Sequence, residues 1–364
     1  MFAIKGLLTV MSNMTIQTKL LQLSRRLYNR MMYWNGWRIV WPMVWALAVA
    51  HAGAMYGLYL LVFGTVMWQT LVWQNCIHLL TAPGITAGAH RLWSHRSFKA
   101  RWPLRLYLMI AQTLSLQRDI YSWSADHRIH HKYSETDADP HNANRGFFYA
   151  HMGWLFVEQH PEVIKKAKNI DLSDLLDDPI VYYQRLFYLP LVAIIWFAIP
   201  VLIPCYLWDE TFINSLFISI TRYIFMLHCA FMVNSVAHLW GIRPYDKNIN
   251  PAESQSVTWL TLGEGYHNYH HVFPYDYSTG EYSWDENFNL TTWLIDWCAR
   301  YGLAYDLKKP SADNIEQTKL KRGNSKLIHK PSIPVLDYVT GIGVQTWIIW
   351  LPLTIRLLLT IATN

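Results

Sequence analysis

The 364-residue sequence contains few charged residues and few cysteines. Only 15% of its residues are Asp, Glu, Lys or Arg, whereas 52% are hydrophobic, a balance that is too apolar for an average soluble protein. Its four cysteines, Cys76, Cys205, Cys229 and Cys298, lie far apart, which argues against a disulfide framework and a thiolate zinc site. The composition therefore predicts a membrane protein, and we expect the cysteines to be buried structural thiols.

The sequence also lacks the motifs of several other classes of protein. Its net charge is +6, but the basic residues form no stripe interleaved with aromatic residues, so nucleic acid is not an expected partner. There is no HExxH motif of zinc proteases, no His-Pro-Gly-Gly haem motif and no glycine-rich dinucleotide fingerprint after a strand. We interpret the basic excess as attraction to an anionic cytoplasmic membrane leaflet.

Long apolar stretches predict four membrane spans. They cover residues 39–63, 66–89, 187–207 and 212–236, each long enough to cross a hydrocarbon core of about 30 Å. The short links within each consecutive pair predict two helical hairpins. Because a polar group facing lipid is costly, the polar residues within these spans should face the bundle or the substrate; examples are His51, Gln74, His78, Asn214 and Arg222.

The distribution of Lys and Arg predicts the orientation of the chain. The segment from Arg91 to Arg185 is rich in them and the two hairpin turns have none, which puts both termini and this segment in the cytosol. Residues 1–38 show no signal-peptide cleavage site and are predicted to be a cytosolic amphipathic segment. The main domain covers 39–308, a polar linker 309–343 and an apolar tail 344–364. A fifth span and an interfacial helix both stay open for the tail, and Arg356 favours the second.

Histidine is the unusual feature of the composition, because eight of the sixteen histidines fall into three tight groups. These are His90-Arg-Leu-Trp-Ser-His95, His127-Arg-Ile-His130-His131 and His267-Asn-Tyr-His270-His271. Histidines at i, i+3 and i+4 share one face of a helix, so that several imidazoles can converge on a metal ion. A hydrogen-bonded structural role explains a single histidine more readily than two HxxHH patterns in one chain.

So many imidazoles exceed the needs of one tetrahedral ion, so two metal ions are predicted. Ligand type alone leaves zinc, copper, nickel and iron open. A histidine set beside apolar helices of acyl length indicates redox chemistry on a lipid. Breaking an unactivated methylene C–H bond requires strongly oxidising metal chemistry, because side chains alone cannot supply it.

Four stretches around these histidines carry a family resemblance: Gly84 to His95, Asp126 to His141, Asn234 to Asn248, and Gly263 to Tyr277. Here the sequence resembles the membrane fatty acid desaturases, and more closely the animal acyl-CoA desaturases of the stearoyl type, over about residues 40–308. The resemblance implies an all-α integral membrane protein with four transmembrane helices under a helical cytosolic cap that holds a di-iron site. The implied metal ligands are His90, His95, His127, His130, His131, His238, His267, His270 and His271, with Asn234 binding through water.

The resemblance also implies an activity and its partners. The protein would be a multi-pass endoplasmic reticulum enzyme that uses two iron ions (Fe²⁺) and dioxygen to insert a double bond into a fatty acyl chain. Its substrate would be a fatty acyl-CoA or a related acyl lipid, and its electron donors cytochrome b5 and the cytochrome b5 reductase. A hydroxylase and a non-catalytic membrane scaffold derived from a desaturase are the rival hypotheses.

Further residues have both a functional and a structural interpretation. Three acidic residues could orient imidazoles or form turns and helix caps: Asp126, Asp137 and Asp139. Four tryptophans could line an acyl tunnel or be interfacial and core aromatics: Trp123, Trp154, Trp240 and Trp259. We expect a structural role for five histidines outside these groups: His141, His151, His160, His228 and His329.

The sequence departs from the resemblance at the positions that would hold the CoA headgroup. Ala125, Glu158 and Gln159 stand where the resemblance implies basic residues, and Met43 replaces an implied asparagine. A carboxylate would repel phosphate groups. Three interpretations follow: other cations such as Arg118 or Arg185 hold CoA, the substrate has a different carrier or is an acyl lipid, or the protein is a weakened enzyme with another role.

Overall fold

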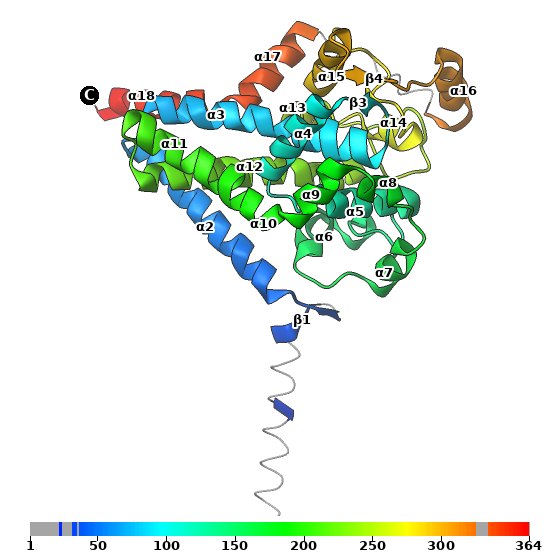
Figure 1. The fold of residues 1–364 in the computed structure, drawn as a ribbon, viewed down its shortest axis with the longest axis horizontal. Helices are drawn as coiled ribbons and strands as arrows, with labels where there is room; N and C mark the ends of the chain where they lie inside the picture. Colours follow the sequence, from blue (N-terminus) through cyan, green and yellow to red (C-terminus); the bar gives the residue numbers. More distant parts are fainter. Residues whose placement is uncertain (1–21, 24–30, 35, 325–333, 364) are drawn as a thin grey trace, which may run out of the picture.

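The structure, a computed structural model, describes residues 22–23, 31–34, 36–324 and 334–363. Within these ranges the chain is mostly helical, as expected (Figure 1). The strands are two short antiparallel pairs, β1 (Tyr33–Trp34) with β2 (Trp37–Arg38) and β3 (Lys99–Ala100) with β4 (Ala304–Tyr305). Most of the expected amphipathic segment, 1–38, and His329 lie outside the described residues.

The helices of the first half are α2 (Trp41–Phe63), α3 (Trp68–Pro83), the π-helix η1 (Gly84–Ser94), α4 (Trp102–Leu114), α5 (Ile120–Tyr133), η2 (Ala143–Arg145), α6 (Phe147–His151), η3 (Gly153–Leu155), α7 (Pro161–Ala167) and α8 (Ser173–Leu176). Those of the second half are α9 (Pro179–Leu186), α10 (Tyr188–Leu191), the π-helix η4 (Val192–Ala198), α11 (Ile199–Trp208), α12 (Phe212–Leu239), α13 (Gln255–Leu260), α14 (His267–Val272), α15 (Leu290–Arg300), α16 (Ala312–Arg322), α17 (Pro334–Gln345) and α18 (Trp347–Thr363).

Three helical stretches are long and apolar enough to cross a membrane: Trp41–Phe63, Tyr188–Trp208 and Phe212–Leu239. They agree with three of the four predicted spans. The fourth prediction, 66–89, is divided between α3, which has only 16 residues, and η1. A further candidate is the pair α17 and α18, which meet at an angle of 78° and satisfy the length and composition criteria only together. The described residues thus contain three or four candidate spans.

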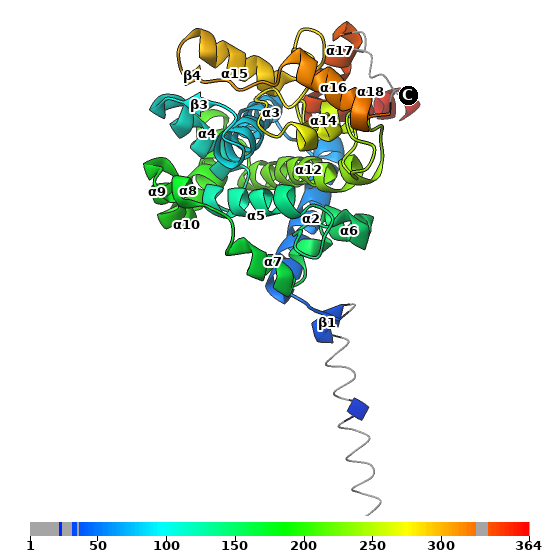
Figure 2. The same ribbon diagram turned by 90° about the vertical axis from the view of Figure 1, so that its right-hand side faces the viewer.

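The long helices extend away from a compact body formed by the shorter ones (Figures 1 and 2), and their far ends come together (Figure 1). Helix α12 runs from those ends into the body. Helix α2 crosses α12 at a Gly53-Ala-Met-Tyr-Gly57 segment, whose glycines allow a close approach. A Cβ atom added at Gly57 would lie 2.0 Å from Thr221 Oγ1 and 2.4 Å from the carbonyl oxygen of Phe217. This contact is therefore one that only glycine permits.

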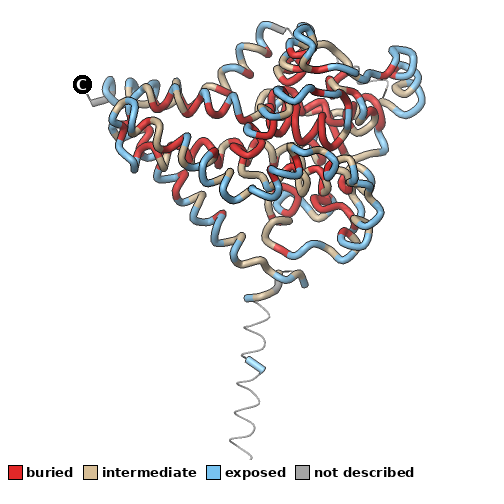
Figure 3. Tube along the Cα trace, in the orientation of Figure 1, coloured by how far each residue is buried: buried red, intermediate tan, exposed pale blue. Residues whose placement is uncertain are grey.

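The long helices carry many exposed residues (Figure 3), and many of these are large and apolar. On α2, the exposed residues include Trp45, Val49, Met55 and Phe63, and α11 exposes Tyr206. Their inner faces bury polar residues, as expected for residues such as Gln74, Asn214 and Arg222. An apolar exterior around a partly polar interior is the arrangement that a bilayer favours, because lipid cannot satisfy polar groups.

The C-terminal part contains more regular structure than the sequence predicts. The expected polar linker, 309–343, includes all of α16 and most of α17, and α17 begins before the expected apolar tail. Asp337 is a polar residue of this segment that is buried, and hydrogen bonds compensate for its burial. Its Oδ1 accepts from Trp259 Nε1 (3.2 Å) and Gln255 Nε2 (3.1 Å). Helix α18 then packs against α2 and α3.

Candidate metal centre

The π-helix η1 brings the first two histidines together. In an α-helix, residues five apart point about 140° away from each other. In η1 the backbone N–H of His95 instead donates to the carbonyl of His90 (3.1 Å), an i to i+5 bond that places one residue above the other. Their ring centroids are consequently 4.9 Å apart. This local geometry explains why a spacing of five can serve one site.

Helices α5 and α14 present their histidines with ordinary α-helical spacing. Asp119 caps the start of α5 by accepting from the backbone N–H of Ser122 (3.0 Å), which fixes the helix two turns before His127. His238 comes from the last turn of α12. The imidazoles therefore converge from four helices that are far apart in the sequence.

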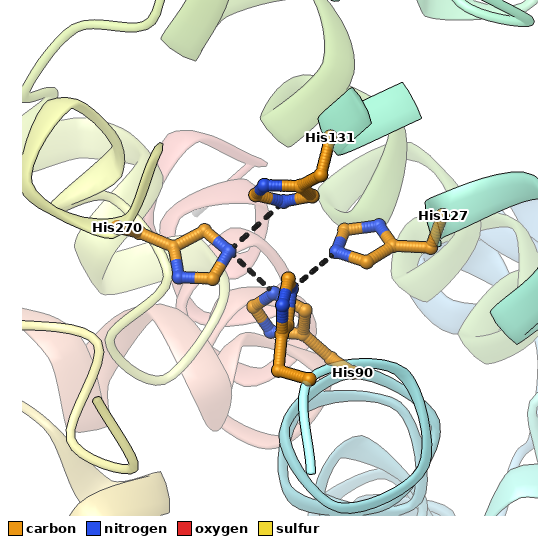
Figure 4. Close-up of side chains that lie close together, drawn as sticks. His90, His127, His131 and His270 are labelled. Atoms are coloured by element: carbon orange, nitrogen blue, oxygen red, sulfur yellow. Dashed lines mark hydrogen bonds between the residues drawn. The ribbon is translucent and has the colours of Figure 1, made fainter. Parts of the chain in front are cut away.

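The nine histidines form two groups. In each group, the potential ligand atoms all lie within 4.8 Å of one another. Figure 4 shows four members of the first group pointing toward a common centre. The first group consists of His90, His95, His127, His131 and His270, and the second of His130, His238, His267 and His271.

The nitrogen atoms in these groups are placed so that each group can share one cation. His270 Nε2 lies 2.9 Å from His90 Nε2 and 3.1 Å from His131 Nε2. His267 Nε2 lies 2.8 Å from His238 Nε2 and 3.1 Å from His271 Nε2. One N–H cannot serve two neighbours, so lone pairs face one another in both groups. Nitrogens about 3 Å apart are also typical ligands around an ion bound at about 2 Å.

Buried carboxylates hold three of these imidazoles in the required tautomer. Nδ1 of each ring donates to a carboxylate, so that Nε2 is left free to bind a metal ion. The pairs are His90 with Glu264 (2.8 Å), His130 with Asp139 (2.8 Å) and His238 with Glu135 (2.6 Å). Glu264 is itself held by Arg91, whose guanidinium donates to it at 2.6 Å and 3.1 Å.

Burial keeps most of the clustered imidazoles neutral. Burial, and then the positive charge on neighbouring imidazoles, lowers the pKa well below the usual 6.5 for His95, His127, His131, His267, His270 and His271. Burial acts in the same direction on His130, but the charge of Asp139 and its hydrogen bond outweigh it and raise that pKa. The pairing in turn lowers the pKa of Asp139, which overcomes the effect of its burial. Neutral imidazole is the form that binds metals.

A mostly apolar cavity runs beside the two histidine groups. Its walls include His90, His127 and His267, together with Asn234, which lies one turn before His238 on α12. The remaining lining is largely aliphatic and aromatic, from α2, α3, α12 and the loop after α4. A long apolar chain in this cavity would pass directly beside the imidazoles.

The structure separates the other predicted site residues into two sets. Trp123, Trp154 and Asp126 line the cavity. Trp240 does not line it and is 57% exposed, and Trp259 is engaged in the hydrogen bond to Asp337. Of the three acidic candidates, Asp139 contacts an imidazole. Asp137 pairs with Arg145 at the surface, where its side chain is 70% exposed, and Asp126 pairs with Arg118.

Sequence reasoning missed Glu135 and Glu264, which contact imidazoles as Asp139 does. Both lie within four residues of a clustered histidine, a spacing that could have pointed to them. It also assigned only a structural role to His141, which lines the cavity and contacts the ring of Trp154. Burial and then the charge of His130 lower the pKa of His141 to about 3.

The remaining histidines stand apart from the metal centre. His51 contacts His228 (Nε2 to Nε2, 2.9 Å), and His228 Nδ1 contacts His151 Nε2 (2.9 Å). This row of hydrogen bonds ends at the carbonyl oxygen of Leu47 on one side and at the hydroxyl of Ser235 on the other. Three neutral imidazoles can therefore make all of these hydrogen bonds. His160 caps α7 by accepting from a backbone N–H. These contacts agree with the structural roles expected for His151, His160 and His228.

The fold and the site together define a helical membrane protein whose paired histidine groups can bind metal. Its relatives identify the family. The fatty acid desaturase family model matches residues 72–306. The chain is 50% identical over 287 residues to stearoyl-CoA desaturase 5 of Bos taurus, covering 79% of this chain and 84% of that protein. It is 51% identical over 276 residues to the acyl-CoA Delta(11) desaturase of Trichoplusia ni, covering 76% and 78%.

A third relative extends the comparison. The stearoyl-CoA desaturase of Homo sapiens is 52% identical over 273 residues, covering 75% of each chain. The chain therefore belongs to the fatty acid desaturase family, as its histidine motifs predict.

Proposed function

We propose that this protein is an oxygen-dependent acyl-CoA desaturase of fatty acid biosynthesis. The reaction converts one CH₂–CH₂ unit of a saturated acyl chain into CH=CH. Dioxygen accepts the two hydrogen atoms of that unit together with two further electrons and two protons, and leaves as two molecules of water. The mammalian and insect relatives described above support this activity, because they are stearoyl-CoA and acyl-CoA desaturases.

One observation carries the proposal: both histidine groups adjoin a cavity whose exposed wall is mostly apolar. Metal ligands and acyl-lining residues alternate on the same helices, for example His90 and Ile85 on η1 and Asn234 and Leu227 on α12. A soluble substrate would need more polar partners than this lining offers. A hydrocarbon chain needs only apolar contact and a position beside the metal centre.

The metal ions that we propose are two Fe²⁺ ions. Their ligands would be the nine clustered histidines, with Asn234 binding through a water molecule. The neutral, converging imidazole nitrogens fit such ions, and the buried carboxylates offset their charge. Bound iron would supply the oxidising power that removes hydrogen from an unactivated methylene, which no side chain of this protein can do.

The protein's own residues would position and shield the reaction. The carboxylates that accept hydrogen bonds from His90, His130 and His238 fix the orientation of these rings. Metal binding would therefore require no rearrangement of them. Trp123 stacks on His127, with ring centroids 4.9 Å apart, and thereby supports one wall of the cavity beside the metal centre. The mostly apolar lining would keep water out of the cavity. The exclusion of water would protect reactive species from side reactions.

The electrons and the cellular location are also part of the proposal. Because the sequence shows no fused haem or dinucleotide motif, cytochrome b5 and its reductase would supply the electrons. The protein would lie in the endoplasmic reticulum membrane with four spans, the second formed by α3 and the start of η1. The N-terminus, the histidine groups and the cap of shorter helices would face the cytosol, where Lys and Arg are concentrated. Helix α18 would instead end beside the lumenal turn between α2 and α3, because Arg356 donates to the carbonyl oxygen of Gly64 there (2.8 Å), so the cytosolic C-terminus expected from the sequence does not fit this arrangement.

The acyl carrier that we propose is CoA, held by cations other than those the family resemblance implies. The negative charge of Glu158 is offset by Arg38, which pairs with it at 3.0 Å on the surface, so Glu158 would repel phosphate less. Arg118 lines the cavity, pairs with Asp126 and keeps its side chain 48% exposed. Its backbone has a positive φ of 68°, a strained conformation that often marks functional loops. Arg118 is thus suited to bind a phosphate at the cavity.

Expression in cells that lack their own desaturase tests the proposed function. We expect the wild-type protein to produce a monounsaturated acyl species, seen by lipid mass spectrometry as a loss of two hydrogens. A double variant, His270→Ala with His271→Ala, should abolish it, whereas His160→Ala, outside both groups, should not. A product that gains one oxygen instead would indicate a hydroxylase. Wild-type protein in the membrane without any product would refute the proposal.

A further inference from the structure

The C-terminal helices reach the cavity although they lie beyond the residues matched by the desaturase family model, 72–306. Gln345, the last residue of α17, lines the cavity and is only 2% exposed. It comes to lie there because α17 packs against α13 and α3. A segment outside the family match therefore contributes to the wall of the cavity.

Two hydrogen bonds fix the side chain of Gln345 in this position. Its Oε1 accepts from His78 Nε2 (2.7 Å), another residue of the cavity wall, and its Nε2 donates to the carbonyl oxygen of Trp259 (2.8 Å). The amide can make both bonds in only one orientation, because oxygen accepts and nitrogen donates. His78 and Gln345 thus form a polar bridge in a cavity whose lining is mostly apolar.

The bridge and the metal centre lie at separate places along the cavity, and an acyl chain would occupy the space between them. His78, Ala82, Thr86 and His90 all line the cavity, so the lining continues from α3 into η1. His78 and His90 are twelve residues apart along these two helices, which places the bridge several helical turns from the metal centre. The lining residues between them are mostly apolar, so the cavity is suited to hydrocarbon up to the bridge.

Three contacts hold the C-terminal helices against the rest of the protein. Arg356 of α18 donates to the carbonyl oxygens of Leu61 (3.0 Å) and Gly64 (2.8 Å) at the end of α2, where the helix leaves carbonyls without intrahelical partners. Asp337 of α17 is bound by Trp259. Ile348, 2% exposed, packs into the cluster that contains Leu61 and Ile218. These contacts make the position of Gln345 a fixed part of the fold.

We propose that α17 and α18 build the end wall of the acyl cavity, and that the His78–Gln345 bridge limits the length of acyl chain between the reacting carbons and the methyl end. The inference rests on the proposed desaturase activity. A hydrocarbon chain that extends past the bridge would have to break the hydrogen bond between His78 and Gln345. The polar groups of both side chains would then be buried without partners, which is unfavourable. Shorter chains would leave apolar wall uncovered, which also lowers affinity.

Substrate competition in desaturase-deficient cells tests the end wall. Cells receive equimolar saturated fatty acids of graded chain length, and the products are compared among wild type, Gln345→Ala and Gln345→Phe at equal protein in the membrane. Gln345→Ala should shift the products toward longer chains, by about fourfold for each methylene that gains contact. Gln345→Phe should shift them toward shorter chains. Gln317→Ala, the same type of change at an exposed position on α16, is the control.

The outcomes separate the inference from the proposed function. Wild-type activity with an unchanged chain-length profile in both Gln345 variants would overturn the end wall and leave the desaturase activity standing. No unsaturated product from wild type would overturn both. If Gln345→Ala does not accumulate, the opposite shift expected for Gln345→Phe decides. The double-bond position, counted from the carboxyl end, should stay the same in every variant, because the metal centre is unchanged.

Discussion

At the scale of single residues, the main feature of the site is the set of carboxylates behind the imidazoles. Asp139, Glu135 and Glu264 each accept a hydrogen bond from one Nδ1. Each is buried or largely buried and thus isolated from water. Such partners fix the ring orientation and raise the basicity of the ligand nitrogen. The affinity of the centre for metal therefore depends on residues that do not bind the metal themselves.

Asp139→Asn should weaken metal binding by about 10- to 100-fold, because the amide no longer carries the charge that supports His130. Iron content per purified protein and desaturation in cells should fall together. The control is Asp137→Asn, two residues away, whose carboxylate is exposed and pairs with Arg145. Equal iron content in the two variants would contradict the assignment of Asp139.

Glu253→Gln should change how stability depends on pH. Burial, above all, raises the pKa of Glu253 from 4.5 to about 8, although a hydrogen bond from the backbone of Tyr269 opposes it. Between these pH values the folded protein holds a proton that the unfolded chain releases, so stability falls as pH rises. The difference corresponds to about 5 kcal/mol. A glutamine at this position still offers an oxygen to the N–H of Tyr269 but cannot ionise. The variant should therefore not lose stability in this way as pH rises.

Thermal unfolding in detergent between pH 5 and pH 8 measures this effect. The melting temperature of the wild type should fall across the range, and that of Glu253→Gln should fall less. Glu316→Gln, where the wild-type side chain is 64% exposed, should behave like the wild type. Parallel curves for all three proteins would show that Glu253 does not titrate in this range.

Arg118→Gln should raise the KM for acyl-CoA by about 10-fold or more, because one charge-assisted hydrogen bond to phosphate is lost. The kcat should change little, since the residue does not touch the reacting carbons. Arg185→Gln is the comparison, because its guanidinium lies 3.9 Å from the ring of Tyr121. An unchanged KM in Arg118→Gln would favour a different acyl carrier or a different cation.

At the scale of secondary-structure elements, the crossing of α2 and α12 depends on the absence of a side chain. In an isolated helix Ala is more favourable than Gly by about 1 kcal/mol. At Gly57 we expect the opposite sign, a loss of about 1–3 kcal/mol, because the added methyl would meet the backbone of Phe217.

Unfolding of Gly57→Ala in detergent should therefore begin at a lower temperature than in the wild type. Gly53→Ala should cost less, because its nearest contact would be the flexible side chain of Ile220 at 3.3 Å. Gly343→Ala, with no atom within 4 Å of the added Cβ, controls for helix propensity. Equal melting temperatures for Gly57→Ala and Gly343→Ala would refute the close crossing.

At the scale of the whole molecule, the distribution of charge sets the expected orientation in the membrane. The turn between α2 and α3 should face the lumen, whereas the shorter helices around Glu158 should face the cytosol. In sealed microsomes, a membrane-impermeant thiol reagent should therefore label Glu158→Cys directly. It should label Thr65→Cys only after permeabilisation. The reverse pattern would invert the proposed topology. Both positions are exposed, so accessibility of the residue itself does not decide the result.

The sequence alone determined the class of the protein and much of the site. Apolar length and charge predicted three spans that the structure contains as long helices, because hydrophobic length is a local property. The HxxHH patterns indicated a metal site because helical spacing is also local. Nine clustered histidines were named before any geometry, the ninth, His238, mainly through the family resemblance. Their role as ligands stays a prediction.

Tertiary structure decided the features that depend on distant segments. Spacing could not show that a π-helix would align His90 with His95, or that Glu264 and Glu135 would contact imidazoles from elsewhere in the chain. Nor could it show that the segment expected as a linker would fold into α17 and bring Gln345 to His78. Local patterns specify helices and their faces, whereas contacts between faces arise only when distant helices pack together.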